Sequence, residues 1–129
     1  MNRNSRQMTR QGIIFFIGLL LFAQAGFAQQ KNTDRLLAVL SQAKEDTSKV
    51  NALLELTTVF KNRNIDSARA FGNQARELAE KIKYPASVAL AYKNLGISYY
   101  PSDNMMMLEN WNKSLEVYRS IKDSVGEAS

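Results

Sequence analysis

The sequence predicts an all-α protein, built as a solenoid of antiparallel helix hairpins. After Gln29, apolar residues recur three or four positions apart, a spacing typical of amphipathic helices and not of strands. The same part of the chain contains only two prolines. When the chain is shifted by 39 residues it aligns with itself, so that Leu56 matches Leu95. A repeated pair of helices is typical of an α-solenoid.

The composition excludes several classes of site. The chain of 129 residues suggests at most one domain, and it contains no Cys and no His. Disulfides, thiolate nucleophiles, His-based catalysis and nearly all zinc sites are therefore excluded. Three of the positive charges precede residue 11, and from Gln29 onward 14 Lys or Arg face 12 Asp or Glu with no basic run. We therefore expect no nucleic-acid partner.

Residues 1–28 are predicted to be a secretory signal peptide. A segment with three arginines precedes an unbroken apolar run of 11 residues, Gly12–Phe22. Small residues follow, and we place cleavage after Ala28, with Ala25 as the second choice. The alternative is an uncleaved membrane anchor, although roughly 20 residues are needed to span a bilayer. We expect the mature protein to be exported to the periplasm or cell envelope.

Five helices are expected beyond this segment, over residues 33–45, 48–62, 65–83, 87–100 and 105–121. Thr33, Thr47 and Asn64 are expected N-caps, because their side-chain oxygens can accept a hydrogen bond from a backbone N–H. Proline disfavours helical geometry in the residue before it. Pro85 and Pro101 are therefore expected to lie between helices.

The 39-residue alignment pairs the apolar faces of two successive hairpins. The aligned pairs are Leu53 with Tyr92, Leu56 with Leu95, Phe60 with Tyr99, Ala68 with Met107, Ala75 with Ser114, Leu78 with Val117, and Ile82 with Ile121. The predicted organisation is a signal peptide (1–28), a lead-in helix (29–47), a first repeat (48–86), a second repeat (87–124) and the start of an incomplete third repeat (125–129).

The second hairpin resembles a tetratricopeptide repeat (TPR). The first helix of that family carries an aromatic residue, then Leu-Gly, then Tyr, and "YKNLGISYY" supplies Tyr92, Leu95, Gly96 and Tyr99. The second helix carries a small residue, an aromatic and another small residue, and "MLENWNKSLEVY" has Met107, Trp111 and Ser114 there. The first hairpin departs from the pattern, with Thr57 in the place of the usual Gly and Gly72 in the place of the usual aromatic.

Gly96 lies in the middle of a predicted helix, where glycine costs about 0.5–1 kcal/mol relative to alanine. We expect close helix packing to offset this cost. On this hypothesis bulky Met107 and Trp111 lie opposite Gly96, whereas the first hairpin places small Ala68 and Gly72 opposite the larger Thr57.

The segment before the repeats, "LLAVLSQAKEDTSKVNALLELT", resembles the lead-in of exported TPR regions in bacterial sensory proteins. This resemblance implies a protein–protein or peptide interaction module, as the sensory or scaffolding part of a larger signalling protein. One alternative is a stand-alone envelope adaptor. The other is the input region of a histidine kinase or LuxR-type transcriptional regulator whose output domain lies beyond Ser129.

"VGEAS" at 125–129 aligns with the start of the second repeat. The chain is therefore expected either to be a fragment or to self-associate through its open C-terminal end, because solenoids usually need about three repeats and a polar terminal helix. The alternative is a genuine two-repeat protein with a frayed tail.

No residues for catalysis, a cofactor, a metal or a small-molecule substrate are evident, and we expect no enzymatic activity. Glu77 with Lys81 and Glu109 with Lys113 are expected to be ordinary ion pairs four residues apart on solvated helix faces. Three consecutive methionines at 105–107 could be taken for a copper site, because thioethers bind Cu(I). Adjacent helical residues point about 100° apart and cannot converge on one ion, so these side chains are expected to fill core space.

The predicted binding surface is the concave face, which the first helix of each hairpin would form. Resemblance to peptide-binding TPR modules assigns to it Asn51, Leu54, Thr58, Lys61, Leu90, Lys93, Asn94, Ile97 and Tyr100. Lys and Asn on such a face can hold a peptide carboxylate or backbone through charge-assisted and amide hydrogen bonds. The alternative is that Lys93 and Asn94 are ordinary surface residues.

Overall fold

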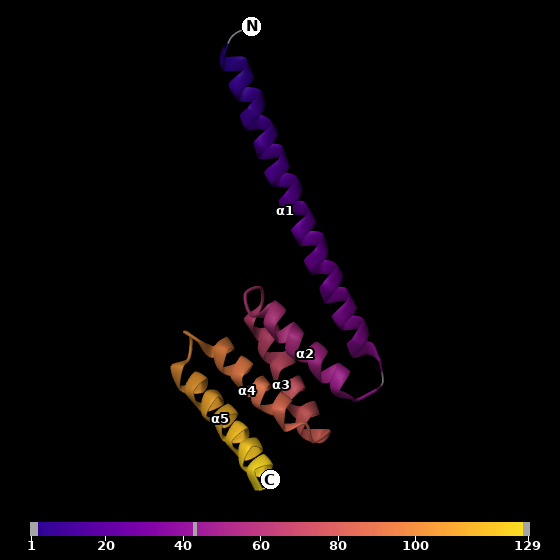
Figure 1. Cartoon of the computed structure of the whole chain (residues 1–129), viewed down its shortest axis with the longest axis vertical. Helices are drawn as coiled ribbons and strands as arrows, with labels where there is room; N and C mark the ends of the chain where they lie inside the picture. Colours follow the sequence, from indigo (N-terminus) through magenta and orange to yellow (C-terminus); the bar gives the residue numbers. More distant parts are fainter. Residues whose placement is uncertain (1–2, 43, 128–129) are drawn as a thin grey trace. The chain divides into compact units, whose positions relative to one another are not determined.

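The protein is helical throughout the part of the chain that the structure describes. The computed structural model describes residues 3–42 and 44–127, with side chains placed for these except at 3–8, 19, 22–23 and 126–127. These residues form α1 (Arg3–Ser41), α2 (Thr47–Phe60), α3 (Ile65–Lys81), α4 (Pro85–Tyr99) and α5 (Asn104–Glu127), with no strand among them (Figure 1). The predicted all-α class is confirmed.

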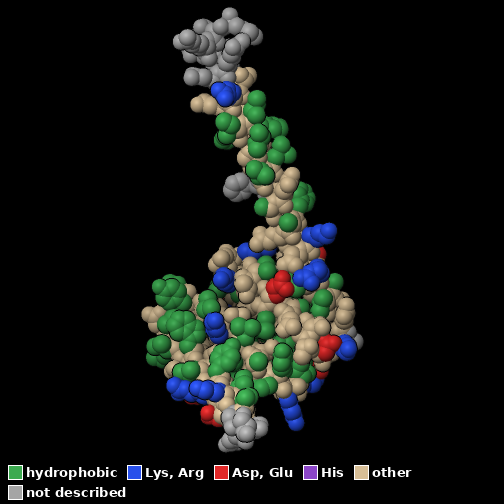
Figure 2. Space-filling model, viewed as in Figure 1, with side chains coloured by type: hydrophobic (Ala, Val, Ile, Leu, Met, Phe, Trp, Pro, Cys, Tyr) green, Lys and Arg blue, Asp and Glu red, His purple; other side chains and the backbone are tan. Residues whose placement is uncertain are grey.

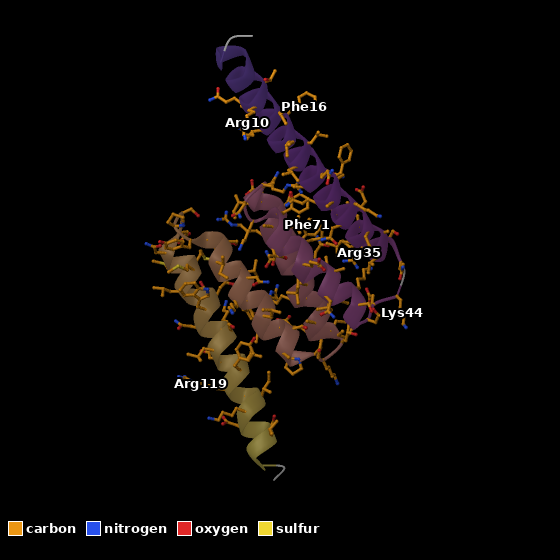
Figure 3. The ribbon with its side chains drawn as sticks, turned by 45° about the horizontal axis from the view of Figure 1, so that its top comes forward. Arg10, Phe16, Arg35, Lys44, Phe71 and Arg119 are labelled. Atoms are coloured by element: carbon orange, nitrogen blue, oxygen red, sulfur yellow. The ribbon has the colours of Figure 1, made fainter. Side chains whose placement is uncertain are left out.

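The chain divides into two compact units, Met1–Arg35 and Leu36–Ser129, and each is described by itself. The first unit is most of α1. The apolar side chains that the structure describes in this unit, including Ile14 and Phe16, are exposed (Figures 2 and 3). Within the described residues, no helix combines the length and the apolar character that crossing a bilayer requires.

The lead-in helix was expected to begin at Thr33, but it does not. Helix α1 passes through Ala28 and Thr33 without a break and ends at Ser41. The Thr33 hydroxyl donates to the carbonyl of Gln29 at 3.0 Å, which is a bond inside a helix and not an N-cap. No Gly or Pro lies between Ala28 and Ser41, so nothing in this segment favours a helix end.

The N-caps predicted for α2 and α3 were Thr47 and Asn64, and the structure confirms only the second. Asp46, not Thr47, caps α2, and its Oδ1 accepts from the backbone N–H groups of Ser48 at 3.0 Å and Lys49 at 3.2 Å. A carboxylate is favoured at this position because the helix N-terminus carries positive partial charge. Asn64 caps α3 as predicted, and its Oδ1 accepts from Ser67 N–H at 2.9 Å.

The junction between α3 and α4 also differs from the prediction. Lys83 has φ = 57°, and the N–H of Tyr84 donates to Ala79 O at 2.8 Å, which is the bonding of a Schellman helix end. Pro85 does not lie between the helices. It is the first residue of α4, where its missing N–H costs nothing.

The 39-residue period appears in the helix ends and caps. Helix α2 ends at Phe60 and α4 at Tyr99, whereas α3 begins at Ile65 and α5 at Asn104. Asp103 Oδ1 accepts from Met106 N–H at 3.0 Å, repeating the Asn64 cap of α3. Helix α5 breaks the period, because it continues to Glu127 without the new helix start expected near Val125.

The core of the second unit lies between the antiparallel helices. Helix α3 packs against α2 and α4, α4 packs against α5, and α2 also contacts α4 (Figure 1). Phe60 and Phe71 stack at 5.4 Å between ring centroids. The aligned residues of the two hairpins are all buried or half-buried. The main core cluster contains Val50, Leu53, Leu54, Ala75, Leu78, Ala79, Val88 and Ala91.

Candidate binding surfaces

A small hollow lies between α2 and α4, where the concave face was predicted. It is lined by Thr57, Thr58, Lys61, Asn94 and Ile97 and has a volume of about 30 Å³. Four of these residues were predicted to share a binding face, so the structure brings them together. The volume corresponds to about one water molecule, which suits the end of a single side chain.

The other predicted residues are placed differently. Leu54 was expected on the binding face, but it is only 6% exposed and belongs to the main core cluster. Its assignment to the face is therefore wrong, because α3 and α4 cover the side of α2 on which it lies. Asn51, Leu90 and Tyr100 are exposed but do not line the hollow.

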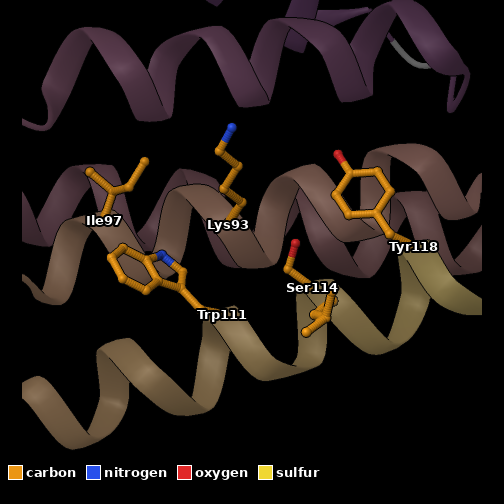
Figure 4. A pocket seen from close by; sticks show the side chains of 6 residues that line it. Lys93, Ile97, Trp111, Ser114 and Tyr118 are labelled. Atoms are coloured by element: carbon orange, nitrogen blue, oxygen red, sulfur yellow. The ribbon is translucent and has the colours of Figure 1, made fainter.

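Lys93 lines a larger groove, between α4 and α5. The groove has a volume of about 290 Å³ and is lined by Lys93, Ile97, Trp111, Ser114, Leu115 and Tyr118 (Figure 4). Its lining is apolar apart from the Lys93 amine, the hydroxyls of Ser114 and Tyr118 and the indole N–H of Trp111. We call this surface the α4/α5 groove.

The sequence prediction missed this groove, although a signal was present. Leu108, Trp111, Leu115 and Tyr118 follow one another at spacings of three and four, and they form a second apolar row on α5 beside the buried one. Ser114 links the two helices that line the groove, because its buried hydroxyl donates a hydrogen bond from α5 to Ala89 O of α4 at 2.7 Å.

A third, polar surface lies over α3, α4 and α5, and its lining includes Asn73, Arg76, Glu109 and Lys113. Lys113 binds Glu109 at 2.6 Å, which confirms that predicted pair, and this hydrogen bond raises the pKa of Lys113.

The predicted pairing of Lys81 with Glu77 is wrong. Lys81 instead binds Glu45 across a distance of 36 residues in the chain, while Glu77 pairs with Arg76 at 3.3 Å.

The described residues contain no cluster of three or more Asp or Glu side chains that could hold a metal ion. No protein-family model, curated protein or solved structure matches the chain.

Proposed function

We propose that residues 48–124 form a TPR-like helix-hairpin solenoid whose function is to bind a protein or peptide segment. The observation that carries this proposal is the 39-residue period, because the end of α2, the start and N-cap of α3 and the aligned buried positions recur in α4 and α5. Gly96 between Leu95 and Tyr99 supports it further, since it permits the close approach of α4 and α5.

The binding surface of this proposal is the hollow between α2 and α4 with its exposed surroundings. Lys61 and Asn94 line it and supply an ammonium and an amide group. An ammonium can bind a peptide carboxylate, and an amide can bind the peptide backbone as donor and acceptor. Thr58 and Ile97 provide the adjacent contacts. The corrected face comprises Asn51, Thr58, Lys61, Leu90, Asn94, Ile97 and Tyr100, without Leu54 and with Lys93 at its edge.

Selection of short random peptides on the full chain tests this proposal. Enriched peptides are expected to carry carboxylates, and their affinity is to be measured by fluorescence polarisation. The double substitution Lys61→Glu with Asn94→Ala should weaken binding about 10- to 100-fold, because a charge-assisted and a neutral hydrogen bond are lost. Lys31→Glu, which reverses the charge of an exposed lysine on α1, is the matched control. If selected peptides bind the double variant as tightly as the control, the proposed face is wrong.

The wider role we propose is that of an exported sensory or scaffolding part of a larger signalling protein. Support comes from the signal-peptide pattern of residues 1–28 and from the lead-in segment that precedes Leu53. In a bacterial host, the protein in the periplasmic fraction should begin at Gln29. Sequencing of the gene beyond codon 129 separates an input region from a stand-alone adaptor, since a kinase or DNA-binding output favours the first and a stop codon the second.

A further inference from the structure

Helix α5 carries two rows of residues along its length. The inner row is buried or half-buried and consists of Met107, Asn110, Ser114, Val117 and Ile121. The second row is exposed, with Leu108 at 54%, Trp111 at 40%, Leu115 at 46%, Tyr118 at 44% and Val125 at 63%, and it is apolar except at Lys122, which stands between Tyr118 and Val125. We call the second row the exposed stripe. A helix with an apolar stripe at spacings of three and four is typical of one that packs against another helix.

The first hairpin shows what covers this face. The residues of α3 that lie 39 positions before the stripe are Arg69, Gly72, Arg76 and Ala79. Helix α4 covers all four positions. The Arg69 guanidinium lies 4.2 Å from the centre of the Tyr99 ring, and Nη2 donates to Ser98 O at 2.9 Å.

Helix α4 also covers the other three positions of α3, which are Gly72, Arg76 and Ala79. A Cβ added at Gly72 would lie 2.8 Å from Cδ2 of Leu95. Arg76 lies over the ring of Tyr92 at 5.7 Å, and Ala79 is completely buried in the cluster that includes Val88. The face of the first hairpin that a helix covers is therefore exposed in the second hairpin, over the described residues.

The chemistry of the exposed face specifies its occupant. Leu108 and Leu115 stand at the positions of Arg69 and Arg76, so the occupant must offer apolar contacts in place of the tyrosines that receive those arginines. The α4/α5 groove also contains Lys93, which favours an acidic group on the occupant.

Helix α5 itself meets both requirements. It offers the exposed stripe, and Glu116 and Asp123 form an exposed acidic row, seven residues apart, on the side of the helix opposite Ser114, which contacts α4. Glu109 lies one heptad earlier, but it is paired with Lys113. If two α5 helices pack in parallel about a twofold axis, α4 of each copy comes beside the acidic row of the other. An antiparallel pair would instead bring the two α4 sides, and thus the two Lys93 residues, together.

We propose that the α4/α5 groove binds the exposed stripe of α5 from a second copy of the chain, with the two α5 helices parallel. This groove shares Ile97 with the hollow between α2 and α4, but the two proposals are tested at different residues, Leu115 here and Lys61 with Asn94 there, so their failures can be told apart. The contact joins like residues of the two copies, for example Leu115 with Leu115, across the twofold axis.

Sedimentation equilibrium of the full chain measures this contact directly. The molecular mass should double with rising concentration. Trp111 is the only tryptophan, and its emission should shift to the blue over the same range as the stripe becomes buried. Leu115→Glu should halve the mass and abolish the shift, whereas Ser120→Glu, on the opposite side of α5, should change neither. A monomeric wild-type chain overturns the proposal, as does association that survives Leu115→Glu.

Cross-linking tests the orientation of the two helices. The chain has no cysteine, so a disulfide can form only between introduced thiols. Under mild oxidation, Leu108→Cys should give a covalent dimer, because parallel helices bring the two residues together near the axis, and Ser120→Cys should not. A dimer in which Leu108→Cys fails to cross-link overturns the parallel arrangement.

Discussion

The indole of Trp111 occupies the space that a side chain at Gly96 would need. A Cβ added at Gly96 would overlap Cδ1 and Nε1 of Trp111 and would lie 3.1 Å from Met107 O. The hypothesis that a bulky side chain lies opposite this glycine is confirmed for Trp111, whereas Met107 approaches it with its backbone carbonyl and not with its side chain. The first hairpin reverses the sizes, since a Cβ at Gly72 would lie 3.4 Å from Cγ2 of Thr57. Each hairpin therefore pairs one large residue with one small residue at the same crossing.

Gly96→Ala should destabilise the protein. Overpacking costs about 1–3 kcal/mol, and the better helix propensity of alanine returns about 1 kcal/mol, so a net loss of about 1 kcal/mol is expected. Thermal denaturation should show Tm lower by about 4–8 °C. Gly12→Ala is the control, because nothing lies within 4 Å of a Cβ at that position. An unchanged Tm for Gly96→Ala would contradict the packing account.

Arg69→Lys should also destabilise the fold, although the charge is retained. Arg69 binds Ser98 O at 2.9 Å and Ser102 Oγ at 3.1 Å while its guanidinium stacks on Tyr99. A lysine ammonium cannot reproduce this planar arrangement, and we expect a loss of about 1–2 kcal/mol in urea unfolding. Arg63→Lys, in the exposed turn between α2 and α3, should leave the midpoint unchanged. Equal midpoints for the two variants would show that the Arg69 contacts contribute nothing.

Lys83→Gly should stabilise the protein. Lys83 has φ = 57°, a left-handed conformation that costs an ordinary L-residue about 1–2 kcal/mol. Glycine adopts it without that cost, although its unfolded chain is more flexible, so a gain of about 0.5–1 kcal/mol is expected. Lys83→Ala is the comparison, because it removes the same charge and keeps the strain. If both variants have the same denaturation midpoint, the backbone conformation is not the cause.

The equivalent N-caps of α3 and α5 should contribute equally to the free energy of unfolding. Asn64→Ala and Asp103→Ala each leave one backbone N–H without its side-chain acceptor, that of Ser67 or of Met106. We expect each to lower the free energy of unfolding by about 1 kcal/mol, and Asn64→Ser to retain most of the stability. Chemical denaturation of the three variants gives the comparison. A stability loss at one cap only would show that the two hairpin starts are not energetically equivalent.

Asp46 should make stability depend on pH in the acid range. The backbone N–H of Lys49 binds its carboxylate and holds its pKa below the ordinary value of 3.8. A lowered folded-state pKa means that the stabilisation is complete above about pH 4 and is lost as pH falls through the folded-state pKa. The stability advantage over Asp46→Ala should therefore shrink below about pH 4. A constant difference down to pH 2 would be inconsistent with a capping carboxylate.

Much of this fold follows from local sequence. The spacing of Leu53, Leu56 and Phe60 predicts one helix face, and the same spacing 39 residues later predicts the next hairpin. The candidate site was harder to predict. Thr58, Lys61, Asn94 and Ile97 do share a hollow, but Leu54 is buried because α3 and α4 cover it, which depends on packing far along the chain.

The sequence by itself determined the all-α class, the 39-residue period and the contact of Gly96 with Trp111. These depend on residue spacing and on the size of side chains at a repeated crossing, both of which are local. Only the tertiary structure decided that Lys81 binds Glu45 and that α4 and α5 form an apolar groove. A helix has several faces with similar spacing, and the contacts between helices determine which of them remain exposed.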